Sequence, residues 1–458
     1  MPKKKTALTI EERLQQALVP AEEQPYEVPE NWVWVRLGSL LKEIKNGTTI
    51  KQDKSGNGFS VTRIESLQNQ TIDLMRVGTI LETEKIKETD WYKSGDITLS
   101  HINSIEHVGK TALITDAMLP LVHGMNLLRL RFFEIYTPDL FQLYSQTYQY
   151  KNEIRSRINM AVNQVSINQK QLSSLEIPLP PLSEQQRIVK RIEELFAKLD
   201  EAKERLQEVA DSFAVRKAAI LHKAFTGELT KQWRRENGVS DESWEDVSLD
   251  SVCKSIYDGD HMPPPKSETG IPFLVISNVN TGFISFEKCR FVPEEYYDGL
   301  SETRTPEIGD ILYTIVGSYG IPVMVDTDKK FCFQRHMALL KPKDIYNRFL
   351  WRQLQTQSFF EQATSIATGT AQLTVPIKGL RKLIVKCPTL PEQHEIVCLI
   401  DDLVARERSA QQATEQALAR IDLMKKSILA RAFRGELGTN KASEASALEL
   451  LRQVLAEN

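Results

Sequence analysis

Two short stretches carry residue types that could bind phosphate or metal, and both can be tested against the spacing that such chemistry requires. Val-Gly-Lys-Thr at residues 108–111 matches the end of a phosphate-binding loop, but Ser104 stands where that loop needs its first glycine. His101 and His107 are close together, but no carboxylate or cysteine stands at metal-ligand spacing from them. The sequence therefore predicts no nucleotide-binding loop and no metal site.

Motifs of well-known catalytic sites are also missing from the sequence. The chain has no Gly-x-Gly-x-x-Gly, His-Glu-x-x-His or Gly-x-Ser-x-Gly. It also lacks the Asp/Asn-Pro-Pro-aromatic tetrapeptide of adenine methyltransferases, because Pro263–Pro265 is preceded by Met262 and followed by Lys266. We therefore predict no catalytic residue and no cofactor in this chain, since a single-chain methyltransferase or nuclease would need such a motif.

Polar side chains that could read DNA cluster beside glycines in two regions of the chain. Their types suit hydrogen bonds to base edges and to phosphates. In the first region the candidates are Lys45, Asn46, Thr48, Ser100, His101, Asn103, Asn163 and Gln164. In the second region they are Tyr257, Asp258, His261, Asn278, Ser318, Tyr319, Arg335 and Gln372. Polar residues beside glycine also form ordinary turns, which is the alternative role at each position.

Length and composition limit the class of protein. A chain of 458 residues is expected to form two or more cores. Its 58 basic and 61 acidic residues give a net charge of −3, so nucleic-acid binding would need a local basic face or help from a partner. No apolar run reaches the roughly 18 residues of a membrane span, and no apolar segment follows Lys3–Lys5 as in a secretory signal.

The cysteines bear on the compartment in which the protein works. There are five, an odd number without a Cys-x-x-Cys pair, which argues against a disulfide framework and against structural zinc. We expect a protein of the reducing cytoplasm.

An internal repeat organises the chain. The pattern Pro-x-Leu-x-Glu-Gln-x-x-Ile-Val fits residues 180–189 and again residues 388–397. Ala-Phe-x-Gly-Glu-Leu occurs at 224–229 and again, in unchanged register, at 432–437. The similarity extends backwards more weakly, from the segment that opens at Trp32 to the one that opens at Trp244. Two copies of one unit are therefore predicted, each a diverged segment followed by a better-matched helical one.

The better-matched segments have the apolar spacing of coiled-coil helices. The predicted packing positions are Ile188, Ile192, Leu195, Leu199, Leu206, Val209 and Phe213 in the first copy, and Ile396, Ile400, Leu403 and Ile421 in the second. Glu407 and Thr414 interrupt the second stripe and could face a partner protein. Gly227 and Gly435 are expected to end the helices. Pairing the two helices with each other is the economical solution, parallel or antiparallel, and a simple dimerisation coiled coil is the alternative.

The diverged segments read as mixed α/β. Strands are predicted at 96–99, 127–131, 273–276, 310–316 and 337–340, and helices at 138–157 and 348–364. Residues 1–25 suggest a short polar helix, and residues 443–458 an amphipathic one.

In these duplicated motifs the chain resembles the specificity subunit of type I restriction–modification systems, over essentially its whole length. The resemblance implies an α+β fold with an internal pseudo-twofold repeat, in which two target recognition domains are joined by an antiparallel coiled coil. The implied segments are an N-terminal segment 1–28, recognition domain 29–179, helical region 180–230, recognition domain 231–387, helical region 388–438 and C-terminal helical tail 439–458.

The resemblance also implies a function and partners. Each recognition domain would read one half of a bipartite double-stranded DNA target, and the coiled coil would set the gap between the halves. Two methylation subunits would bring S-adenosylmethionine for adenine N6-methylation, and restriction subunits would bring ATP- and Mg-dependent cleavage. The chain itself would be non-catalytic, cytoplasmic and free of membrane contacts. The alternative is a coiled-coil scaffold that does not read DNA.

Overall fold

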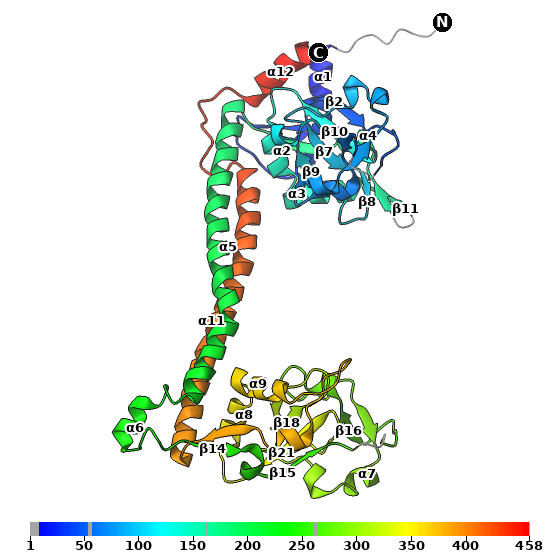
Figure 1. Cartoon of the computed structure of the whole chain (residues 1–458). Helices are drawn as coiled ribbons and strands as arrows, with labels where there is room; N and C mark the ends of the chain where they lie inside the picture. Colours follow the sequence, from blue (N-terminus) through cyan, green and yellow to red (C-terminus); the bar gives the residue numbers. More distant parts are fainter. Residues whose placement is uncertain (1–8, 54–56, 162–163, 261–263, 458) are drawn as a thin grey trace. The chain divides into compact units, whose positions relative to one another are not determined.

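A computed structural model describes residues 9–53, 57–161, 164–260 and 264–457 of the chain (Figure 1). Its contacts divide the protein into two compact units, the first made of Met1–Arg205 and Ala417–Asn458 and the second of Leu206–Gln416. Each unit holds one diverged segment with its own sheet and a part of each long helix. The α+β fold with an internal repeat is therefore confirmed.

The first unit is built on a sheet with the order β2-β10-β7-β9. Its strands are β1 (Val33–Arg36), β2 (Leu41–Asn46), β3 (Phe59–Val61), β4 (Leu67–Gln68), β5 (Thr71–Ile72), β6 (Gly78–Ile80), β7 (Ile97–Ser100), β8 (Ile102–Asn103), β9 (Thr111–Leu113), β10 (Leu127–Phe132), β11 (Asn159–Ala161), β12 (Gln164–Ser166) and β13 (Glu176–Leu179). Its helices are α1 (Ile10–Ala17), α2 (Pro138–Tyr144), α3 (Tyr148–Arg157), α4 (Gln169–Ser173) and α12 (Ala447–Glu457).

The second unit repeats this plan with a sheet in the order β15-β21-β18-β19. Its strands are β14 (Glu245–Ser248), β15 (Cys253–Asp258), β16 (Ile271–Leu274), β17 (Arg290–Val292), β18 (Ile311–Thr314), β19 (Pro322–Met324), β20 (Cys332–Phe333), β21 (Met337–Pro342) and β22 (Ile384–Cys387). Its helices are α6 (Lys231–Asn237), α7 (Glu294–Asp298), α8 (Asn347–Gln353), α9 (Gln357–Ser365) and α10 (Ile377–Leu380).

The two long helices are α5 (Leu182–Phe225) and α11 (Leu390–Ala432). In the first unit, Lys203 pairs with Asp422 at 2.9 Å and Asp200 with Lys425 at 2.5 Å, so the helices run antiparallel (Figure 1). Gly227 and Gly435 lie just beyond the two helices with φ of 76° and 74°, the left-handed conformation expected at a helix end.

The heptad positions differ in burial along the helices. Ile188 and Ile192 are fully buried in the core of the first unit, and Ile396 and Ile400 in that of the second. Phe213 and Ile421 are buried as well. The half-buried positions are Leu195, Leu199, Leu206 and Leu403. Val209 is 39% exposed. The first turns of each helix therefore pack mainly against a recognition domain.

The two interruptions of the second stripe are satisfied within the chain. Glu407 accepts a hydrogen bond from Arg216 at 3.0 Å. Thr414 is buried, and its hydroxyl donates to the Ala410 carbonyl at 2.8 Å. Both side chains therefore have hydrogen-bond partners within the chain.

The structure breaks two of the predicted helices, and it ends the predicted strands 273–276 and 310–316 early, the second of them at Thr314. Helix 138–157 is broken at Ser145–Thr147 into α2 and α3, because the Thr147 hydroxyl caps α3 by accepting from the Tyr150 amide. Helix 348–364 is likewise divided into α8 and α9, with Thr356 as the cap. Strand 273–276 ends at Leu274, because the Asn278 side chain accepts from the Val275 amide and turns the chain into a 3-10 helix.

A buried glutamate joins each long helix to its recognition domain. Glu184 accepts hydrogen bonds from the Trp32 indole at 2.7 Å, the Asn440 amide at 2.8 Å and the Thr439 hydroxyl at 3.2 Å. The neighbouring Gln185 donates to the Ile135 and Pro180 carbonyls, so both residues of the Glu-Gln pair are used structurally.

Glu392 makes the corresponding joint in the second unit with one difference. It accepts from the Trp244 indole at 3.1 Å and the Thr230 hydroxyl at 2.7 Å, and it also forms an ion pair with Arg234 at 2.7 Å. Gln393 again donates to a proline carbonyl, that of Pro388. The duplicated Glu-Gln motif is therefore explained by buried polar contacts that fix the helix to the sheet domain.

The ends of the described chain also lie together. Helices α1 and α12 are side by side (Figure 1), and Arg13 donates to the Leu455 carbonyl at 3.2 Å.

All five cysteines are free thiols. Among the described residues, no helix is both long enough and apolar enough to cross a membrane.

The two joints should differ in their response to the same substitution. Glu392→Gln removes the buried one of the two carboxylates that pair with Arg234, leaving the exposed Asp241 at 2.9 Å, and should lower the free energy of unfolding by about 3 kcal/mol. Glu184→Gln keeps an acceptor for neutral donors and should cost about 1 kcal/mol. Urea unfolding, with hydrogen exchange to distinguish the two units, measures both. Equal costs would show that the ion pair adds nothing to the second joint.

Candidate nucleic-acid interface

The predicted DNA-reading residues of the first unit gather at one end of its sheet. Asn46 at the end of β2 pairs with Leu128, and Ser100 at the end of β7 pairs with Leu127, at the start of β10. The ends of both strands therefore flank the beginning of the central strand β10. β8 continues from this end, and Asn103 on β8 pairs with Val165 on β12, next to the predicted residue Gln164.

The second unit places its candidates at the equivalent end. Asp258 at the end of β15 pairs with Ala338, and Thr314 at the end of β18 pairs with Met337, at the start of β21. The remaining candidates lie in the connections at this end. Arg335 lies two residues before β21, and Ser318 and Tyr319 follow β18. The Gly317 amide donates a hydrogen bond to the Leu373 carbonyl, which brings Gln372 close to the segment that follows β18.

The candidates differ in how free their side chains are. Exposed ones are Asn46, Gln164, Tyr257, Ser318, Arg335 and Gln372. Half-buried ones are Lys45, Thr48, His101, Asn103, Asp258 and Tyr319. Asn163 and His261 lie outside the described residues.

Several candidates have partners within the protein. The Lys45 amine donates to the Thr89 hydroxyl at 2.6 Å and pairs with Asp90 at 3.2 Å. Buried Ser100 accepts from the Asn103 amide at 3.2 Å, so it positions Asn103. Partial burial lowers the pKa of His101, which keeps its ring neutral near pH 7. Lys45, Ser100 and Asn103 therefore fix the shape of the surface rather than offer a free group.

Asn278 has a structural role. It is buried, and its amide donates to the Ser285 and Glu287 carbonyls at 3.1 Å each. Its carbonyl oxygen accepts from the Val275 amide at 3.0 Å. Because these contacts use the whole side chain, we leave Asn278 out of the interface.

Aromatic contacts help to shape the surface of the second unit. The Arg381 guanidinium lies 4.9 Å from the centre of the Tyr257 ring. Tyr319 stacks on Phe360 with ring centres 5.4 Å apart and planes 7° from parallel. Like frames therefore carry unlike side chains, as expected of two domains that read different sequences.

The sequence patterns missed residues that the fold brings to the first interface. Met125 and Asn126 precede β10 and line a hollow of about 520 Å³ together with Lys51, Gln52 and Arg63. Met125 is 49% exposed. The repeat register could have found this turn, because Thr48 bridges Gly124 just as Asp260 bridges Gln334, the residue before candidate Arg335.

Close backbone approach explains the recurring glycines. A Cβ atom on Gly47 would lie 1.8 Å from the Gly124 carbonyl oxygen, and one on Gly259 would lie 2.3 Å from the Phe333 carbonyl oxygen. Side chains at these two positions would push the strand ends apart. The glycines thus hold the connection that precedes the central strand against the end of its neighbour.

The stretches that suggested other chemistry do not form such sites. Residues 108–111 lead into strand β9, whereas a phosphate-binding loop leads into a helix. Within the described ranges, no three His, Cys, Asp or Glu side chains are grouped so that they could hold a metal ion.

A duplicated α/β domain carried on an antiparallel helix pair, with unlike polar residues at like strand ends, defines a two-domain recognition protein. The family model described as type I restriction modification DNA specificity domain matches residues 29–211 and 241–418. The chain belongs to this family.

Individual relatives agree with this membership. The chain is 30% identical over 425 residues to the putative type I restriction enzyme MjaX specificity subunit of Methanocaldococcus jannaschii, covering 86% of this chain and 92% of that protein. It is 26% identical over 464 residues to the type I restriction enzyme EcoKI specificity subunit of Escherichia coli, covering 94% and 96%.

Solved structures share the fold. The HsdS subunit from Thermoanaerobacter tengcongensis superposes with a TM-score of 0.63 at 19% identity, covering 90% of this chain and 99% of that one. A chain from a structure of complex assembly in the type I R-M system gives a TM-score of 0.67 at 18% identity, covering 90% and 100%.

The first unit should become less stable in acid because of His123, a buried residue two positions before Met125. Burial lowers the pKa of His123 to about 3, with repulsion from Arg129 and Lys45 adding to the effect and Asp90 opposing it. In the unfolded chain the pKa is about 6.5, so below that pH the unfolded state binds a proton that the folded state does not.

The contribution of neutral His123 to the free energy of unfolding is therefore fully present above pH 6.5. The free energy of unfolding should fall by about 3 kcal/mol on going from pH 7 to pH 4. Urea unfolding of the wild type and of His123→Gln at both pH values isolates the effect, since other groups titrate alike in the two proteins. An identical pH dependence in both would show that His123 is not held neutral.

Proposed function

We propose that this chain is the DNA-reading subunit of a type I restriction–modification complex, in which each recognition domain reads one half of a bipartite target. One observation carries the proposal: the same end of two equivalent sheets presents different polar side chains on the same backbone frame. A common frame gives both domains a similar approach to the groove, and different side chains give each its own base preference. Membership of the specificity-domain family supports the same conclusion.

The proposal assigns catalysis to other subunits. The chain is non-catalytic, and two methylation subunits supply S-adenosylmethionine and methylate adenine at N6. Restriction subunits supply ATP- and Mg-dependent cleavage. The net charge of −3 supports shared binding, because a chain that is not basic overall needs partners to neutralise DNA phosphates. We propose that the complex works in the cytoplasm.

The antiparallel helices set the gap between the two half-sites in this proposal. Both α5 and α11 run from one unit into the other. We propose that their length sets the distance between the two recognition domains on DNA. A helix is suited to setting a distance, because each residue lengthens it by about 1.5 Å.

Methylome sequencing tests the function. Cells that carry this chain with its methylation subunit should gain N6-methyladenine in a split motif interrupted by unread bases, and cells without the chain should not. A stable complex that produces no new methylation would favour the scaffold alternative. A continuous motif would contradict reading by two separate domains.

The gap should follow the helix length. Seven residues inserted after Ala202 in α5 and seven after Asp422 in α11 preserve the heptad and the ion pair that joins Lys203 to Asp422. The helices then lengthen by about 10 Å, so the unread gap should grow by about three base pairs, with both half-sites unchanged. The matched control, an insertion in α5 alone, should abolish methylation because it shifts the register. An unchanged gap in the double insertion would refute the spacer role.

A further inference from the structure

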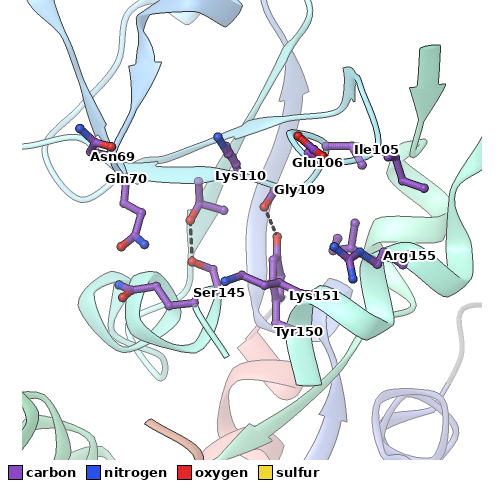
Figure 2. Close-up of a pocket in the computed structure, with 14 residues that line it drawn as sticks. Asn69, Gln70, Ile105, Glu106, Gly109, Lys110, Ser145, Tyr150, Lys151 and Arg155 are labelled. Atoms are coloured by element: carbon purple, nitrogen blue, oxygen red, sulfur yellow. Dashed lines mark hydrogen bonds between the residues drawn. The ribbon is translucent and has the colours of Figure 1, made fainter. Parts of the chain in front are cut away.

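A pocket of about 380 Å³ opens beside the interface of the first unit (Figure 2). Its walls come from residues 108–111, from the turn at Asn69 and Gln70, and from Ser145 through α3. Internal hydrogen bonds fix the walls: the Tyr150 hydroxyl donates to the Gly109 carbonyl at 2.9 Å, and the Thr111 and Ser145 hydroxyls are 2.6 Å apart. The cavity is thus preformed.

The charge of this pocket is positive. Lys110, Lys151 and Arg155 line it, against one carboxylate, that of Glu106. Lys426 on α11 adds to the positive field at Lys151. Like charges held together in this way repel one another, which disfavours the fold unless an anion neutralises them.

The pKa of Lys151 reports this crowding. Partial burial lowers it most, and repulsion by Lys426, Arg155 and Lys110 lowers it further. The charged groups that shift this pKa are therefore all positive. An anion in the pocket would remove part of the repulsion and shift the pKa of Lys151 back toward its usual value.

The pocket lies directly beside the proposed reading surface. The Ser100 amide donates to the Lys110 carbonyl at 2.9 Å, and the Gly109 amide donates to the Ser100 carbonyl at 2.8 Å. Lys110 therefore stands one strand away from the end of β7, about 4.8 Å across the sheet. A DNA strand that contacts the end of β7 has its next phosphates within reach of this edge.

The second unit fills the corresponding place differently. Counting from the equivalent helix caps Thr147 and Thr356, Lys151 corresponds to Phe360 and Arg155 to Thr364. There Tyr319 stacks on Phe360, and its hydroxyl donates to Thr364 at 3.1 Å. The basic pocket is thus a property of the first recognition domain and not of the shared frame.

We propose that this pocket binds a backbone phosphate of the DNA that flanks the half-site read by the first recognition domain. The inference rests on the proposed function. Lysine and arginine side chains around a rigid hollow suit a phosphate diester, which carries one negative charge and accepts several hydrogen bonds. Because a phosphate is the same beside any base, the contact adds affinity and fixes register without adding sequence preference.

Salt titration of DNA binding by the purified complex with its methylation subunits tests the proposal. In Lys151→Gln and in Arg155→Gln, the slope of log affinity against log salt should become less steep by about 0.9, the value for one lost phosphate contact. The change should be equal on target and non-target duplexes. The matched control is Lys42→Gln, an exposed lysine near the start of β2, at the opposite end of the same sheet. Its slope should stay at the wild-type value.

Neutral methylphosphonates placed one at a time along the target locate the phosphate. One position, beside one half-site only, should weaken binding of the wild type about as much as Lys151→Gln does, and should have no further effect on that variant. Thermal unfolding checks folding, and the midpoint of both variants should equal or exceed that of the wild type because repulsion is relieved.

The outcomes separate the two proposals. A wild-type complex that binds no DNA would refute the proposed function itself. A wild type that binds, with Lys151→Gln indistinguishable from Lys42→Gln, would overturn only the pocket assignment. Stabilisation of the wild type by inorganic phosphate, together with unchanged salt slopes in both pocket variants, would make the pocket a free-anion site and would also overturn it.

Discussion

Buried carboxylates at the start of the two long helices hold the architecture together. Glu184 and Glu392 are fully buried, and each ties a helix to the tryptophan that opens its recognition domain. A buried carboxylate without donors is strongly unfavourable, so the helix and the domain must meet in one geometry. Within each unit, this geometry fixes where the sheet and its strand ends lie relative to the long helix. A spacer can set a distance only if both of its ends are rigidly attached.

The same constraint separates what must recur from what can vary. Glycines at the strand ends and the Glu-Gln pair are backbone and joint residues, and both repeats keep them. The side chains beyond the strand ends are not needed for the joint or for the packing of the backbone. Asn46 and Asp258 occupy equivalent positions with different chemistry. A protein that reads two unlike half-sites needs this arrangement, since specificity then changes without loss of the fold.

Electrostatics add a second asymmetry between the recognition domains. The chain is slightly acidic overall, so positive charge has to be concentrated where DNA phosphates lie. The first unit gathers Lys110, Lys151 and Arg155 at the edge of its sheet, and the second has an aromatic stack at the matching place. On the proposed function, the two domains would differ in how they hold the backbone of DNA as well as in which bases they face.

The sequence by itself determined the repeat, the two long helices with their glycine ends, and the strand ends where candidate residues cluster. These follow from periodicity and capping, which are local. The tertiary structure alone decided which polar side chains are free. Asn46 and Asn278 are the same residue type, yet Asn46 is exposed and the amide of Asn278 is used by the Ser285 and Glu287 carbonyls. Likewise, Lys110 and Lys151 meet only through the pairing of β9 and the docking of α3, because burial and charge depend on neighbours distant in sequence.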